Sequence, residues 1–171
     1  MAILTFLRNS VISIPVVTFL IAISINNYYL LLLPIGITIS AIINIILKSC
    51  ASLISHPIFR RPIGSKGCGA GCGNCCYTNT EGFPSGHSQN AWFFCAFMIL
   101  YNCKFGNNSI LVKILYLTFA SIISFSRLGY YSSLGTICHT PLQVIVGSIL
   151  GVLLGAIYFV IINIYLDNKK R

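Results

Sequence analysis

Five long apolar runs constrain the fold of this chain more than any other feature of its sequence. Each run approaches the roughly 20 residues that a helix needs to cross the hydrocarbon core of a bilayer. Pro34, inside the second run, is expected to kink its helix, which lipid-embedded helices tolerate. The sequence therefore predicts an all-α fold, an integral membrane helical bundle of about five transmembrane helices that forms one domain over residues 1–171. The expected spans cover about residues 11–25, 28–47, 88–103, 110–125 and 141–166.

The balance of charged residues supports a membrane protein and argues against nucleic acid as a partner. Hydrophobic residues make up 56% of the chain and charged residues only 8%, whereas a soluble domain carries about 25% charged residues. The chain has 11 basic residues and 2 acidic ones, which give a net charge of +9. Because the basic residues stand beside the apolar runs, anionic membrane lipids or chain topology account for them better than nucleic acid does.

The scarcity of acidic residues also excludes whole classes of chemistry. Magnesium-dependent phosphatases and polymerases need several carboxylates around the metal, and a carboxylate-pair hydrolase needs two acids in one site. Here Glu81 lies in a loop and Asp167 in the C-terminal tail. We therefore expect no metal or other cofactor, and catalysis would have to use histidine, lysine, arginine, serine or cysteine. The three histidines are His56, His87 and His139.

The stretch from Gly82 to Gln89 is a small-residue turn that opens the third apolar run. Ser85 and Gly86 carry little or no side chain, so their backbone N–H groups could approach an anion closely. The helix that starts here would add its positive dipole end and its unpaired N–H groups. His87 would then point at the bound anion. The alternative is that the turn only caps a transmembrane helix.

Two histidines and several cations are expected on one face of the bundle. Lys48 and Arg127 stand where the second and fourth spans end, and His87 and His139 stand where the third and fifth begin. Arg61 lies in the long loop that joins the second and third spans. Such a cluster suits a phosphate group: the cations neutralise its oxygens, one histidine attacks phosphorus, and the other protonates the leaving oxygen.

These residues, from Lys48 to about Gly155, resemble the three signature blocks of the type 2 phosphatidic acid phosphatase superfamily. The resemblance implies a chloroperoxidase-like helical core and a metal-independent lipid phosphatase. His139 would be the nucleophile, which forms a phosphohistidine, and His87 would be the general acid. The resemblance further implies that phosphate is bound by Lys48, Arg61, Ser85, Gly86 and Arg127.

The chain departs from the pattern of that superfamily at three places. Ile54 stands seven residues before Arg61, where the pattern has lysine, so either Lys48 or Lys66 would take that role. The interval between the arginine and the histidine of the last block is longer than usual, and an insertion around residues 132–135 is the simplest account. The aspartate expected four residues after the nucleophile is replaced by Gln143. A glutamine carbonyl can orient an imidazole but supplies no charge.

The loop before the turn contains four closely spaced cysteines, for which three states remain open. Their spacing is similar to that of a zinc or iron–sulfur site, but no second Cys-x-x-Cys pair exists elsewhere. Disulfides would form if the loop faces an oxidising lumen, and free thiols are the third state. These four are Cys68, Cys72, Cys75 and Cys76. The remaining cysteines, Cys50, Cys95, Cys103 and Cys138, are dispersed along the chain.

Within the superfamily, the sequence at 84–89 and again at 139–144 is similar to the dolichyl-diphosphate phosphatase branch. The expected substrate is therefore a lipid phosphate or diphosphate, with a polyprenyl diphosphate preferred. A phosphatidate-type phosphatase is one alternative, and a weakly active relative that binds or transports lipid headgroups is another. A metal-binding redox protein built on the cysteines is a third. The resemblance implies a site that faces the lumen of the endoplasmic reticulum or another endomembrane, which would leave Asn107 cytosolic and unglycosylated.

Overall fold

The computed structural model describes residues 2–54, 56–65, 68, 80–106, 109–128 and 137–169, without the side chains of residues 2–8 and 10–12. The described residues contain helices and no strand, which confirms the all-α prediction. A short 3₁₀ helix, η1, lies between the second and third long helices. The helices in order are α1 Ala2–Ser24, α2 Tyr28–Ile54, η1 Pro57–Phe59, α3 Gly86–Lys104, α4 Ile110–Phe125 and α5 Pro141–Lys169.

The second helix extends further than the sequence predicts. We expected α2 to end near Lys48, but it continues to Ile54 and so carries Lys48 within the helix. Its last two turns hold serines whose hydroxyls bond within the helix: Ser49 donates to a carbonyl one turn earlier at 3.1 Å, and Ser52 donates to the Ser49 carbonyl at 2.7 Å. Because these hydroxyls bond to carbonyls of their own helix, the polar residues after Lys48 can remain helical. The helix ends shortly before Pro57, since a residue that precedes proline disfavours the helical conformation.

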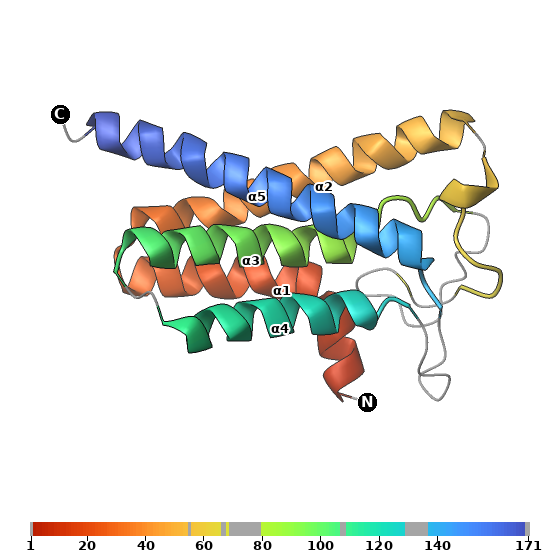
Figure 1. Cartoon of the computed structure of the whole chain (residues 1–171), viewed down its shortest axis with the longest axis horizontal. Helices are drawn as coiled ribbons and strands as arrows, with labels where there is room; N and C mark the ends of the chain where they lie inside the picture. The colour runs from red at the N-terminus through yellow and green to blue at the C-terminus, as the bar shows by residue number, and fades with distance from the viewer. Residues whose placement is uncertain are drawn as a thin grey trace.

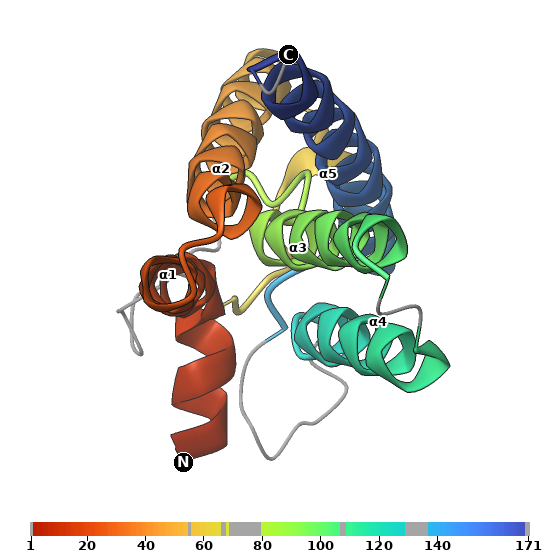
Figure 2. The same cartoon turned by 90° about the vertical axis from the view of Figure 1, so that its left-hand side faces the viewer.

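The five helices form a bundle with α3 inside it (Figure 1). Figure 2 shows α3 surrounded by α1, α2, α4 and α5. The C-terminal ends of α2 and α4 and the N-terminal ends of α3 and α5 lie together at one end of the bundle, on the right in Figure 1. The residues that the sequence assigns to one face therefore do gather at one end.

The central helix α3 packs most closely against α5, through a row of glycines on α5. The row consists of Gly147, Gly151 and Gly155. A Cβ atom at Gly147 would overlap the carbonyl oxygen of Ser85, and one at Gly151 would overlap the carbonyl oxygen of Gln89. The prediction that these glycines form a helix-packing face is confirmed. The same contact brings the start of α5 against the start of α3.

A buried polar cluster joins α2 to α3. The side-chain amide of Gln89 donates to the backbone carbonyl of Ser40 at 2.8 Å, and the Ser40 hydroxyl donates to Asn90 Oδ1 at 2.9 Å. Asn44 Nδ2 donates to Gln89 Oε1 at 2.8 Å. Buried amides are costly unless they are paired. The polar side chains of α3 therefore face a matching polar stripe on α2.

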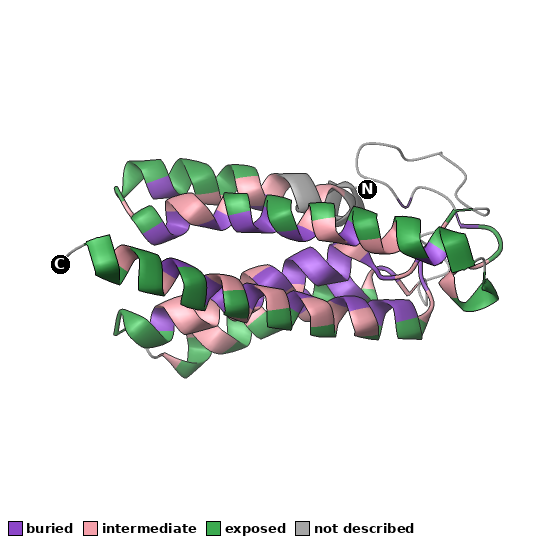
Figure 3. Cartoon of the chain, turned by 90° about the horizontal axis from the view of Figure 1, so that it is seen from above, coloured by how far each residue is buried: buried purple, intermediate pink, exposed green. Residues whose placement is uncertain are grey.

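The outer surface of the bundle is apolar, as Figure 3 shows by the exposed residues along the outer helix faces. Large aliphatic side chains such as Ile45 on α2 and Ile149 on α5 are more than half exposed, at 63% and 54%. In length and composition, α2 and α5 are each able to cross a membrane, while the Ser13–Ser24 part of α1 and the whole of α4 are shorter apolar helices. This surface is compatible with a membrane protein. Five crossings stay a prediction.

Candidate active site

His139 is held by the first turn of α5. It is 2% exposed, and its Nδ1 lies 3.2 Å from Oε1 of Gln143. Thr140 and Gln143 form a reciprocal capping box: the Thr140 N–H donates to Gln143 Oε1 at 3.3 Å, and the Gln143 N–H donates to the Thr140 hydroxyl at 3.4 Å. Pro141 occupies the first helical position, where its missing N–H costs nothing. The local sequence thus starts the helix and places the imidazole at its N-terminal end.

The hydrogen bonds of Gln143 determine the tautomer of His139. Gln143 Nε2 donates to the carbonyl oxygens of Ile58 and Arg60, at 3.1 Å and 2.8 Å. Carbonyl oxygens only accept, so this atom must be the NH₂ group and the other must be the oxygen. Since Oε1 is an acceptor, His139 Nδ1 must carry the proton. The lone pair of His139 is therefore on Nε2.

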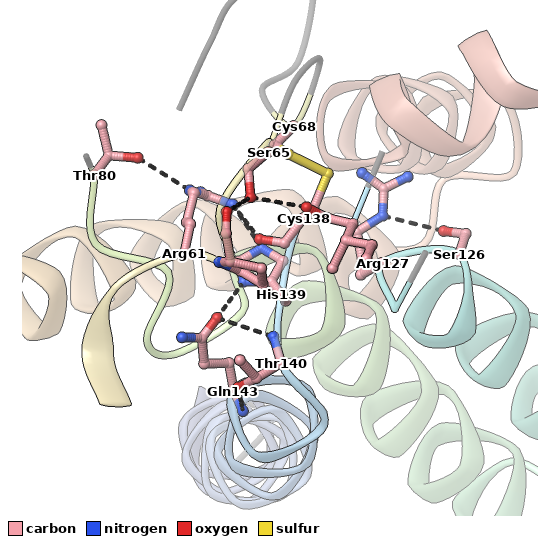
Figure 4. The surroundings of a disulfide bond; sticks show 12 residues. Arg61, Ser65, Cys68, Thr80, Ser126, Arg127, Cys138, His139, Thr140 and Gln143 are labelled. Carbon is pink, nitrogen blue, oxygen red and sulfur yellow. Dashed lines mark hydrogen bonds between the residues drawn. A yellow bond between two sulfur atoms is a disulfide. The ribbon is translucent and has the colours of Figure 1, made fainter. Parts of the chain in front are cut away.

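Arg61 lies against that lone pair. Its Nη1 is 3.1 Å from His139 Nε2 and donates to the carbonyl oxygen of Cys138 at 3.0 Å, while its Nε donates to the Thr80 hydroxyl at 3.1 Å. Figure 4 shows His139 between Arg61 on one side and Gln143 on the other. An anion bound to the Arg61 guanidinium would therefore lie next to the Nε2 lone pair of His139.

The surroundings of His139 keep it neutral. Burial is the largest cause and holds the pKa of His139 well below its usual 6.5; the charges of Arg61, Lys48 and His87 lower it further, in that order. The hydrogen bond to Gln143 acts in the opposite direction and does not offset them. A neutral imidazole with its Nε2 lone pair aimed at a cationic pocket is a nucleophile suited to an anionic centre.

Lys48 and His87 complete the group around this imidazole. His87 is buried in the first turn of α3, and Lys48 reaches the site from within α2. Each lies close enough for its charge to act on His139. The position of Lys48 supports it for the lysine role. The alternative, Lys66, lies outside the described residues, as does the proposed insertion at 132–135.

Ser85 and Gly86 do not both present their N–H groups to a ligand. The Ser85 N–H donates to the backbone carbonyl of Gln143 at 3.0 Å, and the Ser85 hydroxyl is 3.0 Å from that of Ser88. This corrects the expectation of a cradle made by both N–H groups, because the Ser85 N–H joins α3 to α5. Gly86 begins α3, where backbone N–H groups lack partners within the helix.

Arg127 fixes the backbone before His139. It is 5% exposed, and its carbonyl oxygen accepts the N–H groups of Cys138 and His139 at 3.2 Å and 3.1 Å. Its Nε donates to the Ser126 hydroxyl at 3.1 Å. The end of α4 therefore holds the segment that leads into α5. Whether its guanidinium binds phosphate stays a prediction.

A disulfide between Cys68 and Cys138 joins the loop that carries Arg61 to the segment that carries His139 (Figure 4). Both cysteines are 2% exposed and stand 70 residues apart in the sequence. Of the three states that the sequence left open for Cys68, the structure shows the disulfide. The sequence did not predict its partner, Cys138, which it placed among the dispersed cysteines. The others of that group, Cys72, Cys75 and Cys76, lie outside the described residues.

The sequence did not single out Asn44, which supports the turn before α3. Its Nδ2 donates to the Pro84 carbonyl at 3.3 Å, and a Cβ at Gly86 would lie 2.9 Å from its Oδ1. The available signal was the four-residue spacing of Ser40 and Asn44 in an otherwise apolar run, which places both on one helix face.

Comparison with known proteins identifies the family. The family model described as the PAP2 superfamily matches residues 29–166. This chain belongs to the PAP2 superfamily. All candidate site residues of this PAP2 chain, from Lys48 to Gln143, fall within the matched range, whereas α1 lies outside it.

One curated relative of this PAP2 chain is the lipid phosphate phosphatase gamma of Arabidopsis thaliana. The two are 34% identical over 93 residues, which cover 50% of this chain and 38% of the relative. The chain thus spans well under half the length of the curated relative that it matches. No solved structure matches it.

Proposed function

We propose that this PAP2 chain is a metal-independent lipid phosphatase, which hydrolyses a lipid phosphate or diphosphate through a phosphohistidine at His139. One observation carries the proposal: a buried, neutral His139 keeps its proton on Nδ1 by bonding to Gln143 and directs its Nε2 lone pair toward Arg61. With 2 acidic residues in the whole chain, one of them in the tail, no carboxylate cage for a metal can be built.

The first chemical step transfers the phosphoryl group to His139. The phosphate oxygens pair with Arg61, Lys48 and Arg127, and the loss of the Arg61 hydrogen bond frees Nε2 of His139. Nε2 attacks phosphorus, the N–P bond forms, and the bond to the lipid-side oxygen breaks. That oxygen takes a proton from His87. The phosphorylated ring keeps its Nδ1 proton, and the Gln143 carbonyl stabilises the resulting positive charge.

The second step releases phosphate. His87, now neutral, accepts a proton from a water molecule whose oxygen attacks phosphorus. The N–P bond breaks, and its electron pair returns to Nε2 of His139. The sum is hydrolysis: one water is consumed, the lipid leaves with a hydroxyl or phosphate end, and both histidines return to their starting states.

The substrate class that we favour is a polyprenyl diphosphate such as dolichyl diphosphate. The likeness of the segments at 84–89 and 139–144 to the dolichyl-diphosphate phosphatase branch supports this choice. The Cys68–Cys138 disulfide supports a site on the luminal or extracytoplasmic side of an endomembrane, such as that of the endoplasmic reticulum, since disulfides persist in oxidising compartments.

Phosphate release from dolichyl diphosphate, dolichyl phosphate and phosphatidate, measured side by side with EDTA present, tests this function. We expect release from the diphosphate to survive EDTA and to exceed release from the other two. Release from phosphatidate alone would favour the phosphatidate-type enzyme. Silence on all three substrates would contradict the phosphatase and favour a relative that binds or transports lipid headgroups.

Activity is expected to persist below pH 6.5. The neutral form of His139 attacks, and because its pKa is lowered, this form persists in more acidic solution. In a plot of kcat/KM against pH, the fall on the acidic side that is due to His139 should therefore lie below pH 6.5. Arg61→Gln removes one cause of the lowered pKa and should move this fall to higher pH, whereas the ionisation of the substrate stays unchanged. A fall at or above 6.5 in the wild type would contradict the assignment of His139 as the nucleophile.

A further inference from the structure

Gln143 uses both halves of its side-chain amide, and the two halves act on different parts of the site. Oε1 accepts from His139 Nδ1 and from the Thr140 N–H, and Nε2 donates to the carbonyls of Ile58 and Arg60. The side chain is 0% exposed. All four of its amide hydrogen-bonding positions are therefore occupied within the protein.

From this geometry we propose that Gln143 is a positioning residue: it holds His139 next to the segment that carries Arg61. Only an amide side chain can do this. The inference rests on the proposed function. It also implies that the aspartate of the family pattern would not serve here. The glutamine is then a requirement of this site and not a weakened version of an acid.

The two carbonyls that Nε2 holds belong to the segment that carries the main cation. Ile58 is in η1, and Arg60 directly precedes Arg61. The Arg61 guanidinium in turn lies 3.1 Å from His139 Nε2. One side chain therefore fixes the imidazole from one side and the backbone of its cationic partner from the other.

The residues around Gln143 leave little room for a substituted side chain to find new hydrogen-bond partners. A Cβ at Gly82 would overlap Gln143 Oε1, so only glycine leaves room for the amide there. The Gly82 N–H donates to the Phe59 carbonyl at 2.7 Å. The backbones of Arg60 and Glu81 form an isolated antiparallel β-bridge between the same two segments. The backbone on both sides of the amide is thus tied down, and a replaced group cannot swing to new partners.

A carboxylate at position 143 would lose the two hydrogen bonds that the Nε2 group donates. It can accept from His139 Nδ1 and from the Thr140 N–H, as a glutamate in a capping box does. Its other oxygen would face the carbonyls of Ile58 and Arg60 with no proton to donate. Both carbonyl oxygens would lose their donor and meet a negative charge instead.

Gln143→Glu separates this proposal from the simpler roles because it changes the charge and the donors but hardly the shape. If Gln143 only caps α5, the variant should match the wild type. If it only orients His139, the added charge should stabilise the positive ring and raise kcat. Our proposal requires the opposite: kcat at neutral pH falls by roughly tenfold to a hundredfold, with a smaller change in KM.

The pH dependence gives a second signature of the same variant. A protonated glutamate can restore one of the two donated bonds, so the ratio of variant to wild-type kcat should rise as the pH falls. In the wild type His139 stays neutral in that range, since its pKa is held low. Arg61, Lys48 and His87 face His139, and Glu81 acts on Lys48, but these groups are common to both proteins. The ratio therefore removes most of their contribution.

A stability measurement makes the test independent of catalysis. Thermal midpoints of the wild type and Gln143→Glu are compared between about pH 5 and pH 8, where a buried carboxyl group that faces carbonyls prefers its protonated form. We expect the variant to be less stable at the upper end and the gap to close toward the lower end. Asn168→Asp, an exposed amide-to-acid change at the far end of α5, is the matched control and should show neither effect.

The outcomes distinguish this inference from the proposed function. If the wild type releases no phosphate but the stability gap closes with acid, the proposed function fails and the positioning role stands. If the variant is as stable as the wild type at pH 8, or is equally active or faster, the inference is overturned. Gln143→Asp gives a further check: its shorter side chain reaches neither set of partners, so its kcat should be low without recovery in acid.

Discussion

His139→Ala is expected to abolish phosphate release, with kcat lowered on the order of 10⁴-fold or more. The alanine removes His139 Nε2, which lies 3.1 Å from the Arg61 guanidinium and whose lone pair is kept unprotonated by the bond from Nδ1 to Gln143. A water molecule in the vacated space would have no base to activate it in the same position. The measurement is phosphate release from the preferred lipid by purified protein, with EDTA present.

The control for this variant is another histidine of the same chain. His56 is exposed, and its Nδ1 accepts the N–H of Ile58 at the start of η1. His56→Asn keeps an acceptor at that position and should retain wild-type activity. A His139→Ala protein that still releases phosphate at a tenth of the normal rate would exclude the phosphohistidine, and equal losses in both variants would point to a general effect on folding.

Loss of the Cys68–Cys138 disulfide is expected to have the second-largest effect, on both stability and activity. The bond closes a loop with a sequence separation of 70, and the chain-entropy account assigns about 4 kcal/mol to such a closure. Its removal would also loosen Arg61, whose Nη1 bonds to the Cys138 carbonyl, from His139. We expect Cys68→Ala to lower the thermal midpoint clearly and to reduce kcat at least tenfold.

The matched variants for the disulfide use cysteines on the same chain. Cys138→Ala should reproduce Cys68→Ala, and the double variant should be no worse than either single one, because each removes the same bond. Cys50 is free and exposed, so Cys50→Ala should behave as the wild type. Strictly additive losses in the double variant would show that the two cysteines act separately. If the protein keeps full activity and stability after complete reduction, the disulfide contributes to neither, and this prediction is wrong.

The sequence alone determined the features that depend on short-range order. The apolar runs predicted five helices, because their lengths and breaks are local properties. The same applies to the glycine row of α5 and to the start of α3 after Ser85. The sequence also placed basic residues and histidines at the ends of these runs, and the corresponding helix ends lie together at one end of the bundle (Figure 1). Arg61, Lys48 and His87 lie close enough for their charges to act on His139.

Only the tertiary structure decided which groups of distant segments touch. Three contacts join segments far apart in the chain: the disulfide of Cys68 and Cys138, the bond from the Ser85 N–H to Gln143, and the two bonds that the Gln143 amide donates. Such contacts depend on how α3 packs against α5 and on where the loop after α2 lies. A motif names the residues of a site, but a hydrogen bond needs donor and acceptor within about 3 Å, a distance that packing alone sets.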